Sequence, residues 1–341
     1  MRHLGSIRVA LTNGLAAFAL IFGLVPAASA EPVKIRAGWV VTPASMIPFV
    51  FSKPGLAQHQ GKSYVLEPVR IGASSQHITA LAAGEIEIAM LNYASLPLAV
   101  LNAKLDDLRI ICDEITDGAP GHYSVQFWVR KDSGIAKVED LKGKMLATNG
   151  FGTGTHMATR VVMGKRNLKE GTDYRAVEVP FPGMAAALAD KKVDLAVAPN
   201  TVVHDPKFLA MAREVFTMRD AFGASTLSFW TARADFIAKN RGPLTDLIED
   251  YIRAVRWYTD PKNHDEAIAI VSAFTKIPAA TFKGWLFTKD DFYRDPNGLV
   301  DLDALQRNVQ TAKDLGVIPG VIDAKKHGDF SLARAAAARL K

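Results

Sequence analysis

Polar side chains that could hold a small ligand gather at two places where a strand is predicted to lead into a helix. The first is Ser74-Ser75-Gln76, which follows the extended segment Val69-Arg70-Ile71. The second is Gly152-Thr153-Gly154-Thr155-His156, which opens a helix-like segment. Hydroxyl donors beside the free N–H groups of a helix start suit an anion. Each hydroxyl can also merely cap its helix, and a histidine in a first turn can simply be solvated.

Other candidate ligand-binding residues follow predicted strands. They are Thr42 and Pro43, Asn92 and Tyr93, and Asn200. Ligands of α/β proteins bind beyond the carboxyl ends of strands, although asparagine and proline are also ordinary turn residues. Four aromatic residues lie in the segments expected to flank the site, namely Phe127, Trp128, Phe229 and Trp230. Side chains alternate along a strand, so about half of these four should belong to the core. Trp230 is expected to line the site.

The residues that could do chemistry form no arrangement typical of catalysis. The chain has no His-Glu-x-x-His, no Gly-x-Ser-x-Gly and only one cysteine, Cys112. The Gly-Thr loop lacks the lysine of a phosphate-binding loop, and the histidines show no ligand spacing. We therefore expect no enzymatic activity, no metal and no cofactor. An exported α/β enzyme is the alternative from another functional class.

A helix-to-strand unit that occurs twice must position these residues. The segment Val69–Ser95 contains an apolar helix pattern, Gly84 as a stop, and the alternating run Glu85–Met90. When the chain is aligned with itself so that Leu81 falls on Leu188, Ile88 falls on Leu195. The repeat predicts two similar α/β lobes, with Ser74 or Ser75 as the N-cap of the first helix.

Residues 1–30 are typical of a secretory signal peptide. Arg2 and Arg8 precede an apolar stretch, and Ala28-Ser29-Ala30 is a cleavage site, which predicts cutting after Ala30 and a periplasmic protein. Removal of this segment takes away two arginines and no acid, so the formal charge falls from +6 to +4. The sequence contains no block of basic residues interleaved with aromatics, so it does not indicate binding of nucleic acid. Because Cys112 is the single cysteine, a disulfide within the chain is excluded. It lies in a segment with the pattern of a buried strand, which predicts a buried thiol.

The order of several motifs resembles one family of binding proteins. After the signal peptide come the Ser-rich helix start, LAAGEIEIAML, VRKDSGIAKVEDLKGK, the Gly-Thr loop, and near the end Leu315-Gly316-Val317-Ile318. In this order the chain, from about Val33 to its end, resembles solute-binding proteins of ABC importers in the nitrate, sulfonate and taurine branch. Some similar proteins make a thiamine pyrimidine and carry a cysteine-rich segment, which this chain lacks.

The resemblance implies the periplasmic-binding fold of type II, with two lobes that close on a ligand. Each lobe would hold a mixed, mostly parallel sheet flanked by helices, and two crossing strands would join the lobes. We expect lobe 1 to comprise residues 31–125 and 227–341, and lobe 2 residues 126–226. The hinge is expected near Tyr123–Arg130 and Thr226–Thr231.

The predicted function is capture of a small organic anion, a sulfonate or carboxylate with an apolar or aromatic body. The partner implied by the resemblance is an ABC permease in the inner membrane, and the protein is expected to be a monomer. No arginine or lysine is clearly placed in the site loops, so a neutral or zwitterionic solute, such as a thiamine-precursor pyrimidine, is the alternative.

Overall fold

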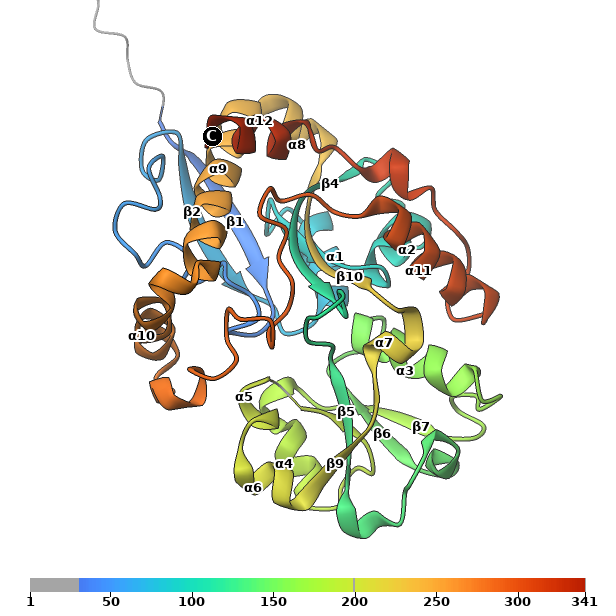
Figure 1. The fold of residues 1–341 in the computed structure, drawn as a ribbon. Helices are drawn as coiled ribbons and strands as arrows, with labels where there is room; N and C mark the ends of the chain where they lie inside the picture. The colour runs from blue at the N-terminus through green and yellow to red at the C-terminus, as the bar shows by residue number, and fades with distance from the viewer. Residues whose placement is uncertain (1–30, 199, 341) are drawn as a thin grey trace, which may run out of the picture. The chain divides into compact units, whose positions relative to one another are not determined.

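Two sheets with the same strand order carry the fold, as the computed structural model in Figure 1 shows for residues 31–198 and 200–340. In the first sheet, β1 (Val33–Trp39) pairs in parallel with β2 (Tyr64–Arg70). The long strand β10 (Ser225–Arg233) lies between β3 (Ala89–Leu91) and β4 (Leu108–Asp117) and is antiparallel to both.

The second sheet is built in the same way. Strand β6 (Met145–Thr148) pairs in parallel with β7 (Arg175–Glu178). Strand β5 (Gln126–Arg130) lies between β8 (Ala196–Val197) and β9 (Ala212–Thr217) and is antiparallel to both. Each sheet is therefore mixed, and the fold class predicted from the sequence is confirmed.

The sequence repeat reappears as a repeat of strand pairing. Ile88 forms a parallel bridge with Ala37 of β1, and Leu195 forms a parallel bridge with Leu146 of β6. Ile88 and Leu195 are the two positions that coincide when the repeat is aligned with itself. These bridges join the parallel and antiparallel parts of each sheet into the orders β2-β1-β3-β10-β4 and β7-β6-β8-β5-β9.

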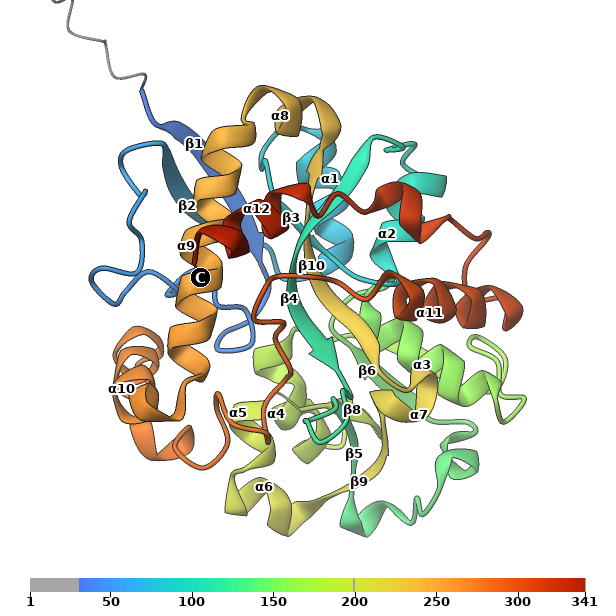
Figure 2. The ribbon, with the colours of Figure 1, turned by 45° about the horizontal axis from the view of Figure 1, so that its top comes forward.

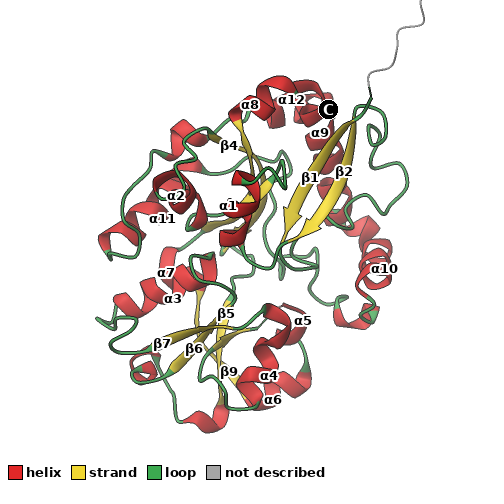
Figure 3. Ribbon diagram, turned by 180° about the vertical axis from the view of Figure 1, so that it is seen from behind, coloured by secondary structure: helices red, strands yellow, loops and turns green. Residues whose placement is uncertain are grey.

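Helices cover the faces of these sheets, as the views in Figures 2 and 3 show. Their bounds are α1 Ser74–Ala82, α2 Ser95–Leu101, α3 Gly154–Gly164, α4 Met184–Ala189, α5 Asn200–Val203, α6 Pro206–Met211, α7 Met218–Phe222, α8 Ala234–Lys239, α9 Arg241–Thr259, α10 His264–Thr275, α11 Leu302–Asp314 and α12 Ser331–Arg339. The longest helix, α9, repeats apolar residues at helical spacing and buries Leu244, Ile248, Tyr251 and Val255. It packs against α12 and β2.

The predicted cap of the first helix is wrong in its detail, and two segments of the chain form no regular α-helix. Residues 46–51 form turns, and residues 138–144 contain only the 3-10 turn Val138–Leu141. The N-cap of α1 is Ala73, because the helix already includes Ser74. Pro48 interrupts the first of these segments, and proline removes a backbone donor that a helix interior needs.

The chain passes twice between the two sheets. It leaves the first through the connection from β4 to β5 and returns through β9, α7 and β10. The division into lobes at residues 125–126 and 226–227 stays a prediction.

The predicted signal peptide and its cleavage after Ala30 lie outside the described residues. The described residues from Pro32 onward form one compact unit. Among the helices that the structure describes, none combines the length and the apolar character needed to cross a membrane.

Candidate ligand-binding site

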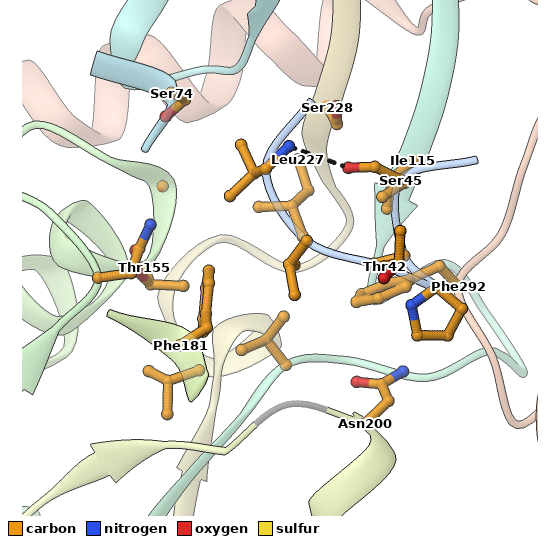
Figure 4. A pocket seen from close by; sticks show the side chains of 18 of the residues that line it. Thr42, Ser45, Ser74, Ile115, Thr155, Phe181, Asn200, Leu227, Ser228 and Phe292 are labelled. Atoms are coloured by element: carbon orange, nitrogen blue, oxygen red, sulfur yellow. Dashed lines mark hydrogen bonds between the residues drawn. The ribbon is translucent and has the colours of Figure 1, made fainter. Parts of the chain in front are cut away.

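A cavity of about 120 Å³ lies beyond the carboxyl ends of β1, β3, β6 and β8, as expected for an α/β protein (Figure 4). Its lining comes from both sheets and from the segment before α11. The lining residues are Val40, Val41, Thr42, Pro43, Ala44, Ser45, Ser74, Met90, Asn92, Ile115, Val125, Asn149, Thr153, Gly154, Thr155, Phe181, Val197, Ala198, Asn200, Thr201, Leu227, Ser228, Trp285, Asp291 and Phe292.

The structure brings many of the residues predicted from the sequence to this cavity. Those that line it are Thr42, Pro43, Ser74, Asn92, Thr153, Gly154, Thr155 and Asn200. The others do not line it, and they are Ser75, Gln76, Tyr93, Gly152, His156 and Trp230. Ser75 and Gln76 follow Ser74 on α1, and successive helix residues point in different directions. Only the first residue of this run therefore lines the cavity.

Trp230 belongs to the core in this structure, which corrects its assignment to the wall of the site. Its side chain is fully buried, and its ring lies 4.4 Å from the ring of Tyr251 on α9. Its neighbour Phe229 is also fully buried, in a different cluster of the core. Both faces of β10 are thus covered, so alternation along the strand does not turn either ring toward the cavity.

The start of α1 is fixed by a network of buried side chains. The amide nitrogen of Asn92 donates to the hydroxyl oxygen of Ser74 over 3.0 Å. The Oδ1 atom of Asn92 accepts from the backbone N–H groups of Ala94 and Ser95, which hold the turn into α2. No side chain caps the N–H groups at the start of α1. Ser74 therefore presents its hydroxyl, and α1 its helix start, to the cavity.

The start of α3 is held by hydroxyl bonds within its own loop. Thr153 donates to the carbonyl oxygen of Gly150 at 2.7 Å, and Thr155 donates to Oδ1 of Asn149 at 2.6 Å. The Thr153 oxygen also accepts from the N–H of His156 and caps the helix. The amide of Asn149 thus becomes part of the lining, and this residue was not among the sequence candidates. Its place at the end of β6 is the signal that could have found it.

His156 supports this loop without lining the cavity. Its Nδ1 accepts from the N–H of Gly152 at 3.1 Å, and its Nε2 lies 2.9 Å from Oε2 of Glu170. Since Nδ1 accepts, the ring hydrogen sits on Nε2 and points to the carboxylate. The hydrogen bond from His156 is the main cause that lowers the pKa of Glu170. His156 is therefore a positioning residue of the loop and does not contact the cavity.

Close contacts connect the loop before α3 with the first sheet. A Cβ atom on Gly150 would lie 2.8 Å from Cβ of Ala73, the residue that precedes α1. Tyr93, which is fully buried, donates from its hydroxyl to the carbonyl oxygen of Gly154 at 2.6 Å. The starts of α1 and α3 consequently line one cavity, and Tyr93 joins them without facing it.

Two more polar residues, Ser228 and Asp291, line the cavity and were not among the candidates from the sequence. Ser228 of β10 donates to Oε2 of the fully buried Glu114 at 2.8 Å. Burial raises the pKa of Glu114 to about 7. Asp291 pairs with Arg294 at 3.1 Å, and both side chains are 1% exposed. Neither Ser228 nor Asp291 lies at a helix start after a predicted strand, so a strand-to-helix pattern in the sequence does not indicate them.

Aromatic rings complete the wall. Phe181, Phe292 and Trp285 line the cavity, and the ring of Trp285 stacks on the ring of His204 at 5.0 Å. Asp291 is the single charged side chain among the described lining residues, and none of these is lysine, arginine or histidine.

The cavity and the two sheets of matching strand order are features of periplasmic binding proteins, and known structures share the fold. The alkanesulfonate-binding protein SsuA from Xanthomonas axonopodis pv. citri, bound to MOPS, is 17% identical, with a TM-score of 0.69 over 89% of this chain and 100% of that one. The aliphatic sulphonate binding protein SsuA from Escherichia coli is 18% identical, with a TM-score of 0.64 over 87% and 92%. The nitrate-binding protein NrtA from Synechocystis PCC 6803 is 16% identical, with a TM-score of 0.69 over 91% and 90%.

The family follows from the amino-acid sequence itself. Residues 28–272 match the NMT1-like family, which is most of the chain, so the protein belongs to this family. No match was found among curated proteins. The resemblance predicted from the motif order is confirmed at the level of family and fold.

Proposed function

We propose that this protein is a periplasmic solute-binding protein that captures a small organic anion and delivers it to an ABC importer. The anion would carry a sulfonate or carboxylate head on an apolar or aromatic body. The names of the structural neighbours, which bind sulfonates or nitrate, support this class of solute. They are named as binding proteins and not as enzymes.

The main support for the proposal is that the starts of two helices line a single, mostly apolar cavity. Helix α1 packs with the first sheet and helix α3 follows β6 of the second. Ser74 at the start of α1 and Thr155 at the start of α3 both lie on the same side of this cavity in Figure 4. Helix starts hold anions with backbone N–H groups and the positive end of the helix dipole. The apolar and aromatic wall would bury the body of the solute.

The mechanism is closure of two lobes on the solute. Closure would bring the starts of α1 and α3 together around the head group, so binding free energy would shift the equilibrium from open to closed. The importer permease would then recognise the closed form. The signal sequence supports export to the periplasm, and a monomer suffices because the site comes from one chain.

One observation favours a second class of solute. Basic side chains are missing from the described lining, so the head group would be held by neutral donors alone. A neutral or zwitterionic solute, including a pyrimidine of the kind that precedes thiamine, would suit such a cavity without needing a cation.

The test is a thermal-shift screen of the purified protein, followed by calorimetric titration. Ethanesulfonate, benzoate, nitrate and 4-aminopyrimidine represent the solute classes. A ligand at 100 times its Kd stabilises the folded state by about 2.7 kcal/mol, which raises Tm by a few degrees at this size. Stabilisation by the neutral compound alone would reject the anion, and turnover of any compound would reject the binding role.

A matched pair of variants tests the site itself. Ser74 and Ser75 are neighbours on α1, but only Ser74 lines the cavity. Ser74→Ala should weaken binding about tenfold or more, because a hydrogen bond to a charged group contributes roughly 1.5–3 kcal/mol. Ser75→Ala should leave Kd within about twofold, which is within the scatter expected of surface substitutions. Equal effects of the two changes would mean that the ligand does not bind at the start of α1.

A further inference from the structure

Two further polar residues of the cavity lining, Asp291 and Ser228, offer hydrogen-bond acceptors. Asp291 is 1% exposed. Its Oδ2 accepts from Arg294 and from the backbone N–H of Phe287, both at 3.1 Å. Its Oδ1 is buried and has no partner among the described residues. An unpaired carboxylate oxygen at a buried site costs free energy unless a donor reaches it.

Ser228 is the second acceptor among these two lining residues. Its hydroxyl hydrogen is directed to Glu114, so toward the cavity this side chain can offer only lone pairs. Ser228 is 4% exposed, and Glu114 is fully buried. The pairing therefore holds the hydroxyl in one orientation.

Donors and acceptors come to the cavity from different segments. Ser74 and Thr155, at the two helix starts, lie on one side in Figure 4, and Phe292 lies on the other. The helix starts offer donors. Asp291, which lines the cavity from the same segment of the chain as Phe292, offers an acceptor.

We infer that the solute carries, apart from its acidic or acceptor head, a hydrogen-bond donor, which is an amino or hydroxyl group. This inference rests on the proposed function and narrows its solute class. Asp291 would select for the donor through Oδ1, while Arg294 balances its charge. Because the pair is neutral as a whole, the donor does not have to be cationic. Solutes with a head group but no donor would leave Oδ1 unpaired and bind less tightly.

Matched ligands test this on the unmodified protein. Ethanesulfonate, 2-hydroxyethanesulfonate and 2-aminoethanesulfonate share one head and differ at the other end, and benzoate and 4-aminobenzoate form an aromatic pair. Calorimetric titration should give a Kd about ten- to a hundredfold lower for the members with a donor, the range expected for a hydrogen bond to a charged group. The hydroxyl and the amino sulfonate should both show the gain.

The variant Asp291→Asn tests the residue. Asparagine keeps an oxygen for Arg294 and Phe287 and replaces the unpaired Oδ1 with an NH₂ donor. The advantage of the donor-bearing ligands should be lost in this variant. The adjacent Asp290→Asn, which removes one charge from an exposed position, should keep it. Should Asp291→Asn fail to fold, the ligand series on the unmodified protein still decides the question.

Each result has one meaning. If the members of a series bind with equal Kd, the inference is overturned and the proposed capture of an organic anion stands. If none of the five compounds binds, the proposed solute class is rejected, and the inference is rejected with it. A donor advantage that persists in Asp291→Asn would also overturn the assignment to Asp291.

Discussion

Thr153 shows how a hydroxyl beside a ligand cavity can act on the loop more than on the ligand. Its hydroxyl donates to the carbonyl oxygen of Gly150, and its oxygen accepts from the N–H of His156. Thr153→Ala should therefore lower the free energy of unfolding by about 1 kcal/mol through loss of the helix cap. Ligand affinity should fall as well, because the loop loses its anchor.

Thr153→Ser is the control, since serine keeps the hydroxyl. Chemical denaturation and titration of both variants with ethanesulfonate or the best ligand of the screen measure the two effects. Full affinity in Thr153→Ala with reduced stability would make this residue a helix cap only.

The buried acids predict how stability depends on pH. Burial raises the pKa of Glu114 to about 7 and that of Asp113 to about 8. The folded state therefore holds these protons at pH values where the unfolded chain has released them. Stability should be greatest below the unfolded pKa values, near pH 4, and decline as pH rises through 7 to 8. For Glu114 the decline amounts to about 3 kcal/mol.

Glu114→Gln should flatten part of this decline, because glutamine does not titrate. The exposed Glu85→Gln should leave it unchanged. Urea unfolding at pH 5, 6, 7 and 8 provides the measurement. A decline of the same slope in Glu114→Gln would show that Glu114 does not titrate in this range.

At the scale of elements, glycine permits the close approach of the α3 loop to the start of α1. A Cβ on Gly150 would lie 2.8 Å from Cβ of Ala73, closer than carbon atoms pack. Gly150→Ala should therefore hinder the contact and raise Kd about tenfold, since overpacking costs about 1–3 kcal/mol. The fold of each sheet should be retained.

Gly72→Ala is a suitable control, because a Cβ there meets nothing within 4 Å. Titration and circular dichroism of the two variants separate the contact from general damage. An unchanged Kd in Gly150→Ala would mean that this approach is not needed for binding.

At the scale of the whole molecule, Tyr93 joins the two sheets through a single buried hydrogen bond. Its hydroxyl donates to the carbonyl of Gly154, while its ring lies 4.6 Å from the ring of Phe222. Tyr93→Phe keeps the ring and removes the bond. Because Tyr93 does not line the cavity, any loss of affinity would come from a less favourable closed form.

We expect Kd to rise about three- to tenfold in Tyr93→Phe, as a typical hydrogen bond contributes roughly 0.5–1.5 kcal/mol. Small-angle scattering without ligand should also show a larger radius of gyration. If both quantities match the unmodified protein, this bond has no part in closure.

The sequence alone determined those features that depend on neighbours along the chain. Helix α1 at Ser74–Ala82 lies within Val69–Ser95 and ends before Gly84, as predicted, because an apolar helix pattern and its stop are local. The internal repeat placed Ile88 and Leu195 at equivalent positions, and their bridges are equivalent in the two sheets. Motif order sufficed for family and fold class.

Only the tertiary structure decided which polar groups face the cavity. Ser74 and Ser75 look alike in sequence, and the direction of the first turn of α1 separates them. Asp291 reaches the cavity from a segment far beyond α1 in the sequence, so no local pattern could place it there. Trp230 is buried because α9 covers its side of β10. Burial and pairing of this kind arise from contacts between distant segments, which local spacing does not encode.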